Sequence, residues 1–185
     1  MIKPKLKLFL TVYLLSQVGF YIYLPLHALF ASGLHIAPKD IALLWSYFSL
    51  LTAILILVFG KIENTRKKET FLAVGMLFYI IADLLLLVVG SFAGLAGTLT
   101  IHAFAGGMTF PAVKTLFAKN ETRGRESEEW SWMDSGNMFA AAVGSAIGAI
   151  VLILDNFKGI FLSMAVMHLL AGIVALHCVR SHKKG

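Results

Sequence analysis

Long apolar stretches, nearly free of charge, follow one another along this chain and restrict its fold more than any other feature. A helix needs about 20 apolar residues to cross the hydrocarbon core of a membrane. The stretches are too long for strands, and backbone groups in lipid must pair within their own segment, so we expect transmembrane α-helices. Of the 185 residues, 58% are hydrophobic and 14% are charged, which excludes a soluble globular domain.

The length leaves room for roughly six spans joined by short loops. The predicted spans cover about residues 8–31, 40–60, 70–90, 94–118, 130–154 and 159–180, within one transmembrane domain over residues 1–185. Pro38 suits the first turn of the second span. Gly90 and Ser91 separate the third span from the fourth, and Asp155 and Asn156 end the fifth.

The positive charges are distributed unevenly between the two sides of this predicted topology. Fourteen of the 16 Lys and Arg residues fall on the side of both termini, within residues 3–7, 61–68, 114–125 and 180–184. The other side holds only Lys39 and Lys158. This asymmetry predicts a multi-pass protein of the cell membrane, in contact with the lipid bilayer and with both termini cytoplasmic. The basic residues are not interleaved with aromatic ones as in single-strand binders, so we expect no nucleic-acid partner.

Asp83 is the only acidic residue well inside a predicted span. A carboxylate in hydrocarbon must face a partner or a water-filled cavity, or be protonated. Tyr79 lies one turn earlier on the same face. Asp83 is therefore either a proton or cation site, or a structural hydrogen-bonding residue between helices.

His102 lies in the fourth span, one turn before Gly106. Gly106, Gly107 and Pro111 form a small, bendable segment that favours close helix approach and frees a backbone carbonyl. A histidine here can titrate near neutral pH and relay protons, or it can be a neutral residue bonded to a neighbouring helix. His27 and His168 also lie in or near spans, and we interpret them as structural.

Polar side chains line one face of the first span at one-turn spacing, at Tyr13, Gln17 and Tyr21. Such a stripe faces a cavity or the bundle interior, so a substrate path is a reasonable hypothesis. We assign Asn137, near the cytoplasmic end of the fifth span, to the same path. Asp134, close by, is expected to pair with the basic loop at Arg66–Lys68.

The fifth span carries small residues at four-residue spacing, at Gly144 and Gly148, which permits close helix packing. A weak internal repeat accompanies them. Pro25 and Pro111 occupy similar places in the first and fourth spans, as do Asp83 and His168 in the third and sixth. Two three-helix halves of opposite orientation would give this 3+3 inverted repeat.

No motif in the chain predicts a cofactor, a metal site or an enzyme. The histidines show no pair at the one-turn spacing of a helical metal site, and the single cysteine, Cys178, excludes an intrachain disulfide. A phosphate-binding loop, a nucleophile elbow and a zinc-protease helix motif are absent from the sequence.

Several segments, in order along the chain, resemble the N-terminal six-helix half of a major facilitator superfamily (MFS) transporter. Gly19-Phe20 followed by Pro25-Leu26 resembles the opening span of the family, and Trp45–Leu50 resembles the second span. Residues 60–68 fall where the family has the loop G-x-L-x-D-R-x-G-R-R. Gly60, Ile62 and the basic end match this pattern, whereas Asn64 replaces the aspartate and Thr65 the first arginine.

The second half of the chain continues the resemblance. His102 stands where proton-coupled family members often carry an arginine one turn before a glycine, with Gly106 in register. Residues 121–125 are similar to the "ERGR" loop. Residues 140–149 resemble the antiporter motif, with Gly144 and Gly148 matching.

The resemblance implies a membrane transporter for a small solute, with a path lined by the first and fourth helices and a cytoplasmic gate loop. The predicted gate residues are Gly60, Asn64, Arg66, Lys67, Lys68 and Asp134. Since the usual cavity lies between two six-helix halves, a second six-helix bundle is needed, either a second copy or a split-gene partner. Small residues of the second and fifth helices would meet that partner. The alternatives are a non-transporting membrane assembly subunit, a fragment of a twelve-helix protein and, least favoured, an intramembrane enzyme.

Overall fold

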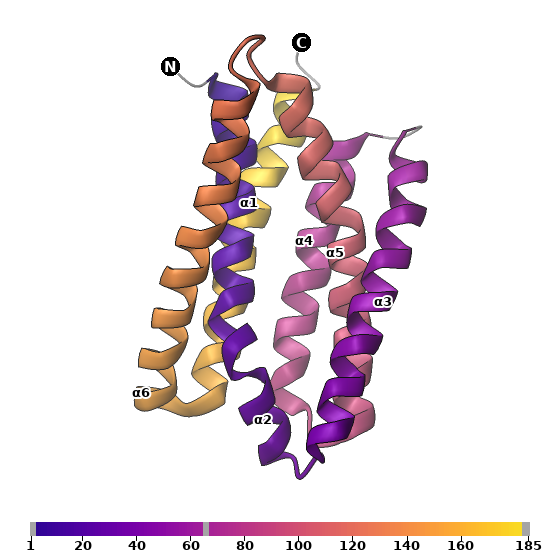
Figure 1. Ribbon diagram of the computed structural model, residues 1–185, viewed down its shortest axis with the longest axis vertical. Coiled ribbons are helices and arrows are strands. Elements are labelled where there is room, and N and C mark those ends of the chain that lie inside the picture. Colours follow the sequence, from indigo (N-terminus) through magenta and orange to yellow (C-terminus); the bar gives the residue numbers. More distant parts are fainter. Residues whose placement is uncertain (1–2, 65–66, 183–185) are drawn as a thin grey trace.

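The protein is a bundle of long helices in a computed structural model that describes residues 3–64 and 67–182 (Figure 1). The helices run roughly along one axis, and the start of the first and the end of the last lie at the same end of the bundle. We call this the termini end. The elements are α1 (Pro4–Tyr23), η1 (Leu24–Leu26), α2 (His27–Gly33), α3 (Pro38–Glu63), α4 (Lys68–Leu85), η2 (Leu86–Val88), α5 (Phe92–Asn120) and α6 (Glu126–His182).

Proline and serine mark the places where helices begin or bend. Pro25 lies in η1, the single 3₁₀ turn that joins α1 to α2, because a proline removes a backbone donor and disturbs the α-helical ladder. Pro38 occupies the first turn of α3. Ser91 caps α5 by accepting a hydrogen bond from the backbone N–H of Gly94 at 3.1 Å.

α6 combines two of the predicted spans. Its backbone leaves the helical conformation at Asn156, with φ 64° and ψ −165°. The side-chain oxygen of Asn156 then accepts a hydrogen bond from the backbone N–H of Lys158 at 2.9 Å, which starts the second half. We call residues 126–154 the α6 arm and residues 156–179 the α6 return helix.

Five helices within the described residues are long and apolar enough to cross a membrane: Pro4–Gly33, Pro38–Glu63, Lys68–Val88, Glu126–Leu154 and Asn156–Val179. α5 covers the predicted span at 94–118 but is not among them. Its threonines, its glycines and His102 make it less apolar than the others. The fourth predicted span, and with it the total of six, therefore stays a prediction.

α1 packs chiefly on α6, α4 packs on both α5 and α6, and α3 packs on α5. A Cβ at Gly144 would lie 2.7 Å from the Val18 carbonyl oxygen of α1, and one at Gly148 would collide with the Ile22 carbonyl. These glycines permit contact between two backbones of the same chain. The expectation that this small-residue face meets a partner bundle is therefore wrong, because α1 occupies it.

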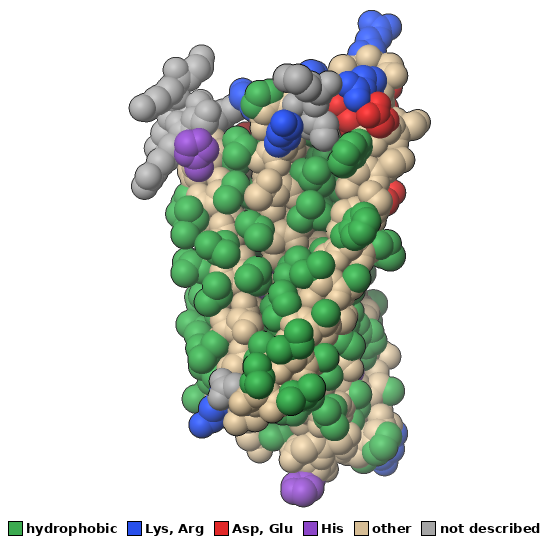
Figure 2. All heavy atoms as spheres, turned by 90° about the vertical axis from the view of Figure 1, so that its left-hand side faces the viewer, with side chains coloured by type: hydrophobic (Ala, Val, Ile, Leu, Met, Phe, Trp, Pro, Cys, Tyr) green, Lys and Arg blue, Asp and Glu red, His purple; other side chains and the backbone are tan. Residues whose placement is uncertain are grey.

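Hydrophobic side chains cover the middle of the molecular face seen in Figure 2, and Lys and Arg lie towards its two ends. Many large apolar residues of α3 and the α6 arm are exposed, among them Leu50, Leu57, Phe139 and Ile153. Only 17% of the apolar window of each of these two helices is buried, against 39% for α4 with η2 and 44% for the α6 return helix. This distribution suits a bundle surrounded by lipid.

Candidate functional site

Three ionisable side chains meet in the interior, and we call them the Asp83 cluster: Asp83 of α4, His102 of α5 and His168 of the α6 return helix. His102 Nε2 lies 2.9 Å from Asp83 Oδ1, and His168 Nδ1 lies 2.6 Å from Asp83 Oδ2. The exposed fractions of these side chains are 0% for Asp83, 5% for His102 and 1% for His168. Each carboxylate oxygen thus has its own imidazole donor, as a buried charge requires.

The number of bound protons sets the charge of the cluster. An ionised Asp83 between two neutral imidazoles leaves one net negative charge, and one further proton makes the cluster neutral. With Asp83 ionised and His168 neutral, Nδ1 carries the hydrogen towards Asp83, and Nε2 is then the ring nitrogen left to accept a proton. That atom is buried and has no hydrogen-bond partner among the described residues. A Cβ at Gly19 of α1 would lie 3.0 Å from it, so α1 passes close by without a side chain.

Tyr79 of α4 covers the cluster. Its ring stacks on His168 with centroids 4.6 Å apart and an angle of 9° between the planes, and it lies 5.8 Å from the ring of His102. Its hydroxyl is near Gly106, where a Cβ would lie 3.3 Å away. Tyr79 is therefore the residue between the Asp83 cluster and the cavity described next.

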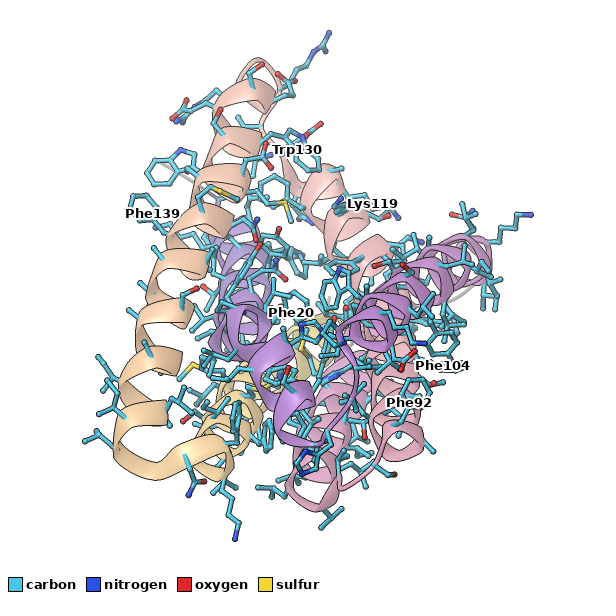
Figure 3. The ribbon with its side chains drawn as sticks, turned by 60° about the horizontal axis from the view of Figure 1, so that its bottom comes forward. Phe20, Phe92, Phe104, Lys119, Trp130 and Phe139 are labelled. Carbon is cyan, nitrogen blue, oxygen red and sulfur yellow. The ribbon has the colours of Figure 1, made fainter. Side chains whose placement is uncertain are left out.

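A cavity of about 230 Å³ borders Tyr79 and lies between α1, α3 and α5. A larger cavity, of about 400 Å³, lies at the termini end and is described below. We call the smaller one the aromatic cavity. Its lining residues are Phe20, Phe48, Ser49, Thr52, Ala53, Ile56, Tyr79, Gly106 and Phe110. Figure 3 places Phe20 on α1, between the α6 arm and α3. The lining has aromatic rings and hydroxyl groups but no charged side chain, so it suits a small uncharged molecule.

The polar stripe of α1 forms a second, separate group at the α6 arm. Gln17 Nε2 donates to Asn137 Oδ1 at 2.6 Å, and Asn137 Nδ2 donates to the Tyr21 hydroxyl at 3.4 Å. We call these three residues the amide network. Tyr13 continues the stripe and lines a crevice against α4 and α5. Among the described residues no hydrogen bond joins the amide network to the Asp83 cluster, so the six predicted pathway residues fall into two groups.

The described members of the predicted gate lie on and at the end of α3, just before and at the start of α4, and on the α6 arm. Asp134 is exposed and close enough to Tyr13 for electrostatic interaction, and within the described part of the chain no ion pair joins it to Lys67 or Lys68. The Lys68 ammonium instead donates to the backbone carbonyl of Glu63 at 2.6 Å. Arg66 lies outside the described residues.

The remaining predicted gate and packing residues lie along α3 and α5. Gly60 faces Pro111, where a Cβ would lie 3.8 Å from the proline Cβ, and Asn64 is exposed at the end of α3. Pro111 lies inside α5. A Cβ at Gly107 would lie 2.6 Å from Leu55 Cβ, so this glycine lets α3 and α5 approach closely.

Sequence reasoning missed that His168 is a partner of Asp83 and treated it as a structural residue. The available signal was the buried carboxylate itself, since a charge inside a span requires a partner and few polar side chains lie in spans. Within the described residues, no group of three or more His, Cys, Asp or Glu is arranged to hold a metal ion. The two carboxylate oxygens are directed to separate imidazoles.

The chain matches a known family over almost its whole length. The family model described as Major Facilitator Superfamily matches residues 9–185. No curated protein matches the chain. The all-helical bundle with its apolar, membrane-length helices agrees with this family of transporters. The chain belongs to the Major Facilitator Superfamily, and it is an integral membrane protein of transporter type.

Proposed function

We propose that the protein moves a small, uncharged solute across the cell membrane, coupled to protons and in partnership with a second bundle. Its family supports transport in general. The observation that carries proton coupling is the Asp83 carboxylate, fully buried between two imidazoles. In this proposal α5 completes six spans as a 3+3 inverted repeat, and both termini are cytoplasmic. The basic residues at the termini end support that orientation.

The coupling proton binds at the Asp83 cluster, with His168 Nε2 as the accepting atom. The ionisable groups around the His168 ring are Asp83 and Tyr79 of α4 and His102 of α5. From α1, the backbone of Gly19 comes close to this ring. Proton binding neutralises the cluster, which removes the electrostatic cost of an isolated charge in a dry interior. The protonated and deprotonated forms thereby differ in how tightly α4, α5 and the α6 return helix hold together.

The solute binds against the aromatic cavity. Phenyl rings supply apolar contact, and the Ser49 hydroxyl supplies a hydrogen bond. The Tyr79 hydroxyl already pairs with the Thr109 side chain. The Thr52 hydroxyl already donates to the backbone carbonyl of Phe48 at 2.7 Å. Tyr79 contacts both the cavity and His168, so a solute at this wall is one side chain away from the proton site.

Coupling is tested by reconstituting the purified chain in liposomes that contain a pH-sensitive dye. A panel of uncharged aromatic and aliphatic solutes is added under an imposed pH gradient. We expect a solute of the right shape to produce proton flux, and Asp83→Asn to reduce that flux about tenfold or more. Asp40→Asn, the same change in the first turn of α3, should leave the flux unchanged. Equal flux through the Asp83→Asn variant, with its fold intact by circular dichroism, would reject proton coupling at Asp83.

The second bundle in this proposal is another copy of the chain, which packs on α3 and the α6 arm. These are the least buried of the five membrane-length helices and carry exposed apolar side chains, such as Leu50 and Phe139. In Figure 3, Phe139 points outward from the α6 arm. Cysteines at Leu50 and Phe139, in a Cys178→Ser background, should crosslink two chains in native membranes. Cysteines at Leu77 and Val166, which are also exposed, should not. If neither the Leu50 nor the Phe139 cysteine variant crosslinks, the homodimer is ruled out.

A further inference from the structure

The larger cavity, of about 400 Å³ at the termini end, is basic. Lysines from separate segments line it: Lys5 of α1, Lys67 before α4, Lys68 at the start of α4 and Lys119 in the last turn of α5. Glu69 is the one acidic residue in this lining. Residues far apart in the sequence thus bring an excess of positive charge to one partly open cavity.

The lysines of this cavity keep donors available. Lys68 uses one N–H for the Glu63 carbonyl, at 2.6 Å. Among the described residues, Lys5, Lys67 and Lys119 form no ion pair with a carboxylate. Their mutual repulsion within one cavity is relieved when an anion binds between them.

Two further features indicate the chemistry of that anion. α4 begins at the cavity with no side-chain cap at its N-terminus, so its helix dipole adds positive potential there. The buried lining residues of the cavity are the apolar Phe9, Leu116 and Cys178 together with Lys68 and Glu69. Exposed lysines beside buried apolar side chains suit a molecule that joins a phosphate group to an apolar part.

We propose that this cavity binds a phosphate-bearing ligand, with Lys5, Lys67 and Lys119 as the groups that contact the phosphate. The ligand is either the headgroup of an anionic phospholipid or a soluble phosphate compound, and the two share the same recognition chemistry. This inference does not depend on the proposed transport function, because the cavity is separate from the Asp83 cluster and the aromatic cavity.

The probes are phosphatidylglycerol and inorganic phosphate, offered to the purified full-length chain in detergent. Native mass spectrometry measures retained lipid, and a thermal shift measures stabilisation by phosphate. We expect the Lys67→Gln/Lys119→Gln variant to bind about tenfold more weakly or worse. The Lys39→Gln/Lys158→Gln variant, with the same charge change at the opposite end, should bind as the wild type does. All four lysines are exposed, so both variants should fold.

Retained phosphatidylglycerol that depends on Lys67 and Lys119 identifies a lipid headgroup site. Lysine-dependent stabilisation by inorganic phosphate, without lipid retention, identifies a soluble phosphate compound. Either result supports the site. Absence of binding by both probes, or equal binding by the Lys67→Gln/Lys119→Gln variant and the wild type, overturns it.

Discussion

The Asp83 cluster and the amide network both place polar side chains between membrane helices, but they differ in charge. The cluster joins α4, α5 and the α6 return helix through a carboxylate and two imidazoles, and it is almost completely buried. The amide network joins α1 to the α6 arm through groups that stay neutral, and its members are half-buried. The first contains groups that can change charge by taking up a proton, whereas the amides of the second cannot. Two polar groups of similar size in one bundle can thus serve different purposes.

The largest expected effect is the removal of the charge at the centre of the cluster. Asp83→Ala leaves two buried imidazole N–H donors without their acceptor. Each unsatisfied donor costs about 1–3 kcal/mol, so the free energy of unfolding should fall by about 2–6 kcal/mol. Thermal unfolding in detergent measures this loss. A midpoint close to that of the wild type would mean that the cluster is held by packing alone, and the contrast with the amide network would disappear.

The next effect concerns what holds α1 to the α6 arm. Gly148→Leu places a side chain against the Ile22 carbonyl and should cost about 1–3 kcal/mol through overpacking. Gly97→Leu is the matched control, since a Cβ at Gly97 meets nothing within 4 Å. Equal unfolding midpoints for the two variants would show that backbone proximity does not determine this contact.

A smaller effect is expected from a substitution on α1 at Gly19, next to His168 Nε2, the nitrogen of the Asp83 cluster that is unpartnered within the described residues. Gly19→Ala brings a methyl group to about van der Waals contact or closer with His168 Nε2, where a Cβ would lie 3.0 Å away. It should shift the pH at which proton flux is half-maximal while changing stability by less than about 1.5 kcal/mol. Liposome assays over a pH series measure the shift. An unaltered pH profile would argue that the proton enters at another atom.

The smallest effect should come from the amide network. Gln17→Leu removes its strongest hydrogen bond, and interhelical hydrogen bonds in membrane proteins contribute only about 0.6 kcal/mol on average. We expect a slight fall in the unfolding midpoint and an unchanged pH profile of transport. A loss as large as that of Asp83→Ala would make the two polar groups equivalent and break the comparison.

The sequence was most informative about features that depend on near neighbours in the chain. Pro38 and Ser91 mark helix starts, and Asn156 marks the reversal within α6, because caps and breaks act over a few residues. A carboxylate in a span requires a partner, so Asp83 was recognisable as a special residue. Its partners were not, since they lie 19 and 85 residues away, and only the packing of three helices brings them together.

Gly144 and Gly148 also show that a local pattern does not identify a distant contact. Their spacing predicts close helix packing, and the structure has it. Spacing on one helix does not specify which neighbour approaches, so a contact with α1 was mistaken for a contact with a second chain. α5 shows a different limit. Its polar residues lower its hydropathy, yet several of them, His102 and Thr98 among them, are turned into the bundle interior.

The single non-helical residue at Asn156 has a mechanical meaning. The α6 arm reverses into the return helix at this one residue, with no loop between the two helices. The orientation of the α6 arm is therefore tied directly to that of the return helix, which carries His168 and its hydrogen bond to Asp83. One of the least buried helices of the bundle is thus continuous with the helix that provides one of the hydrogen bonds of the buried carboxylate.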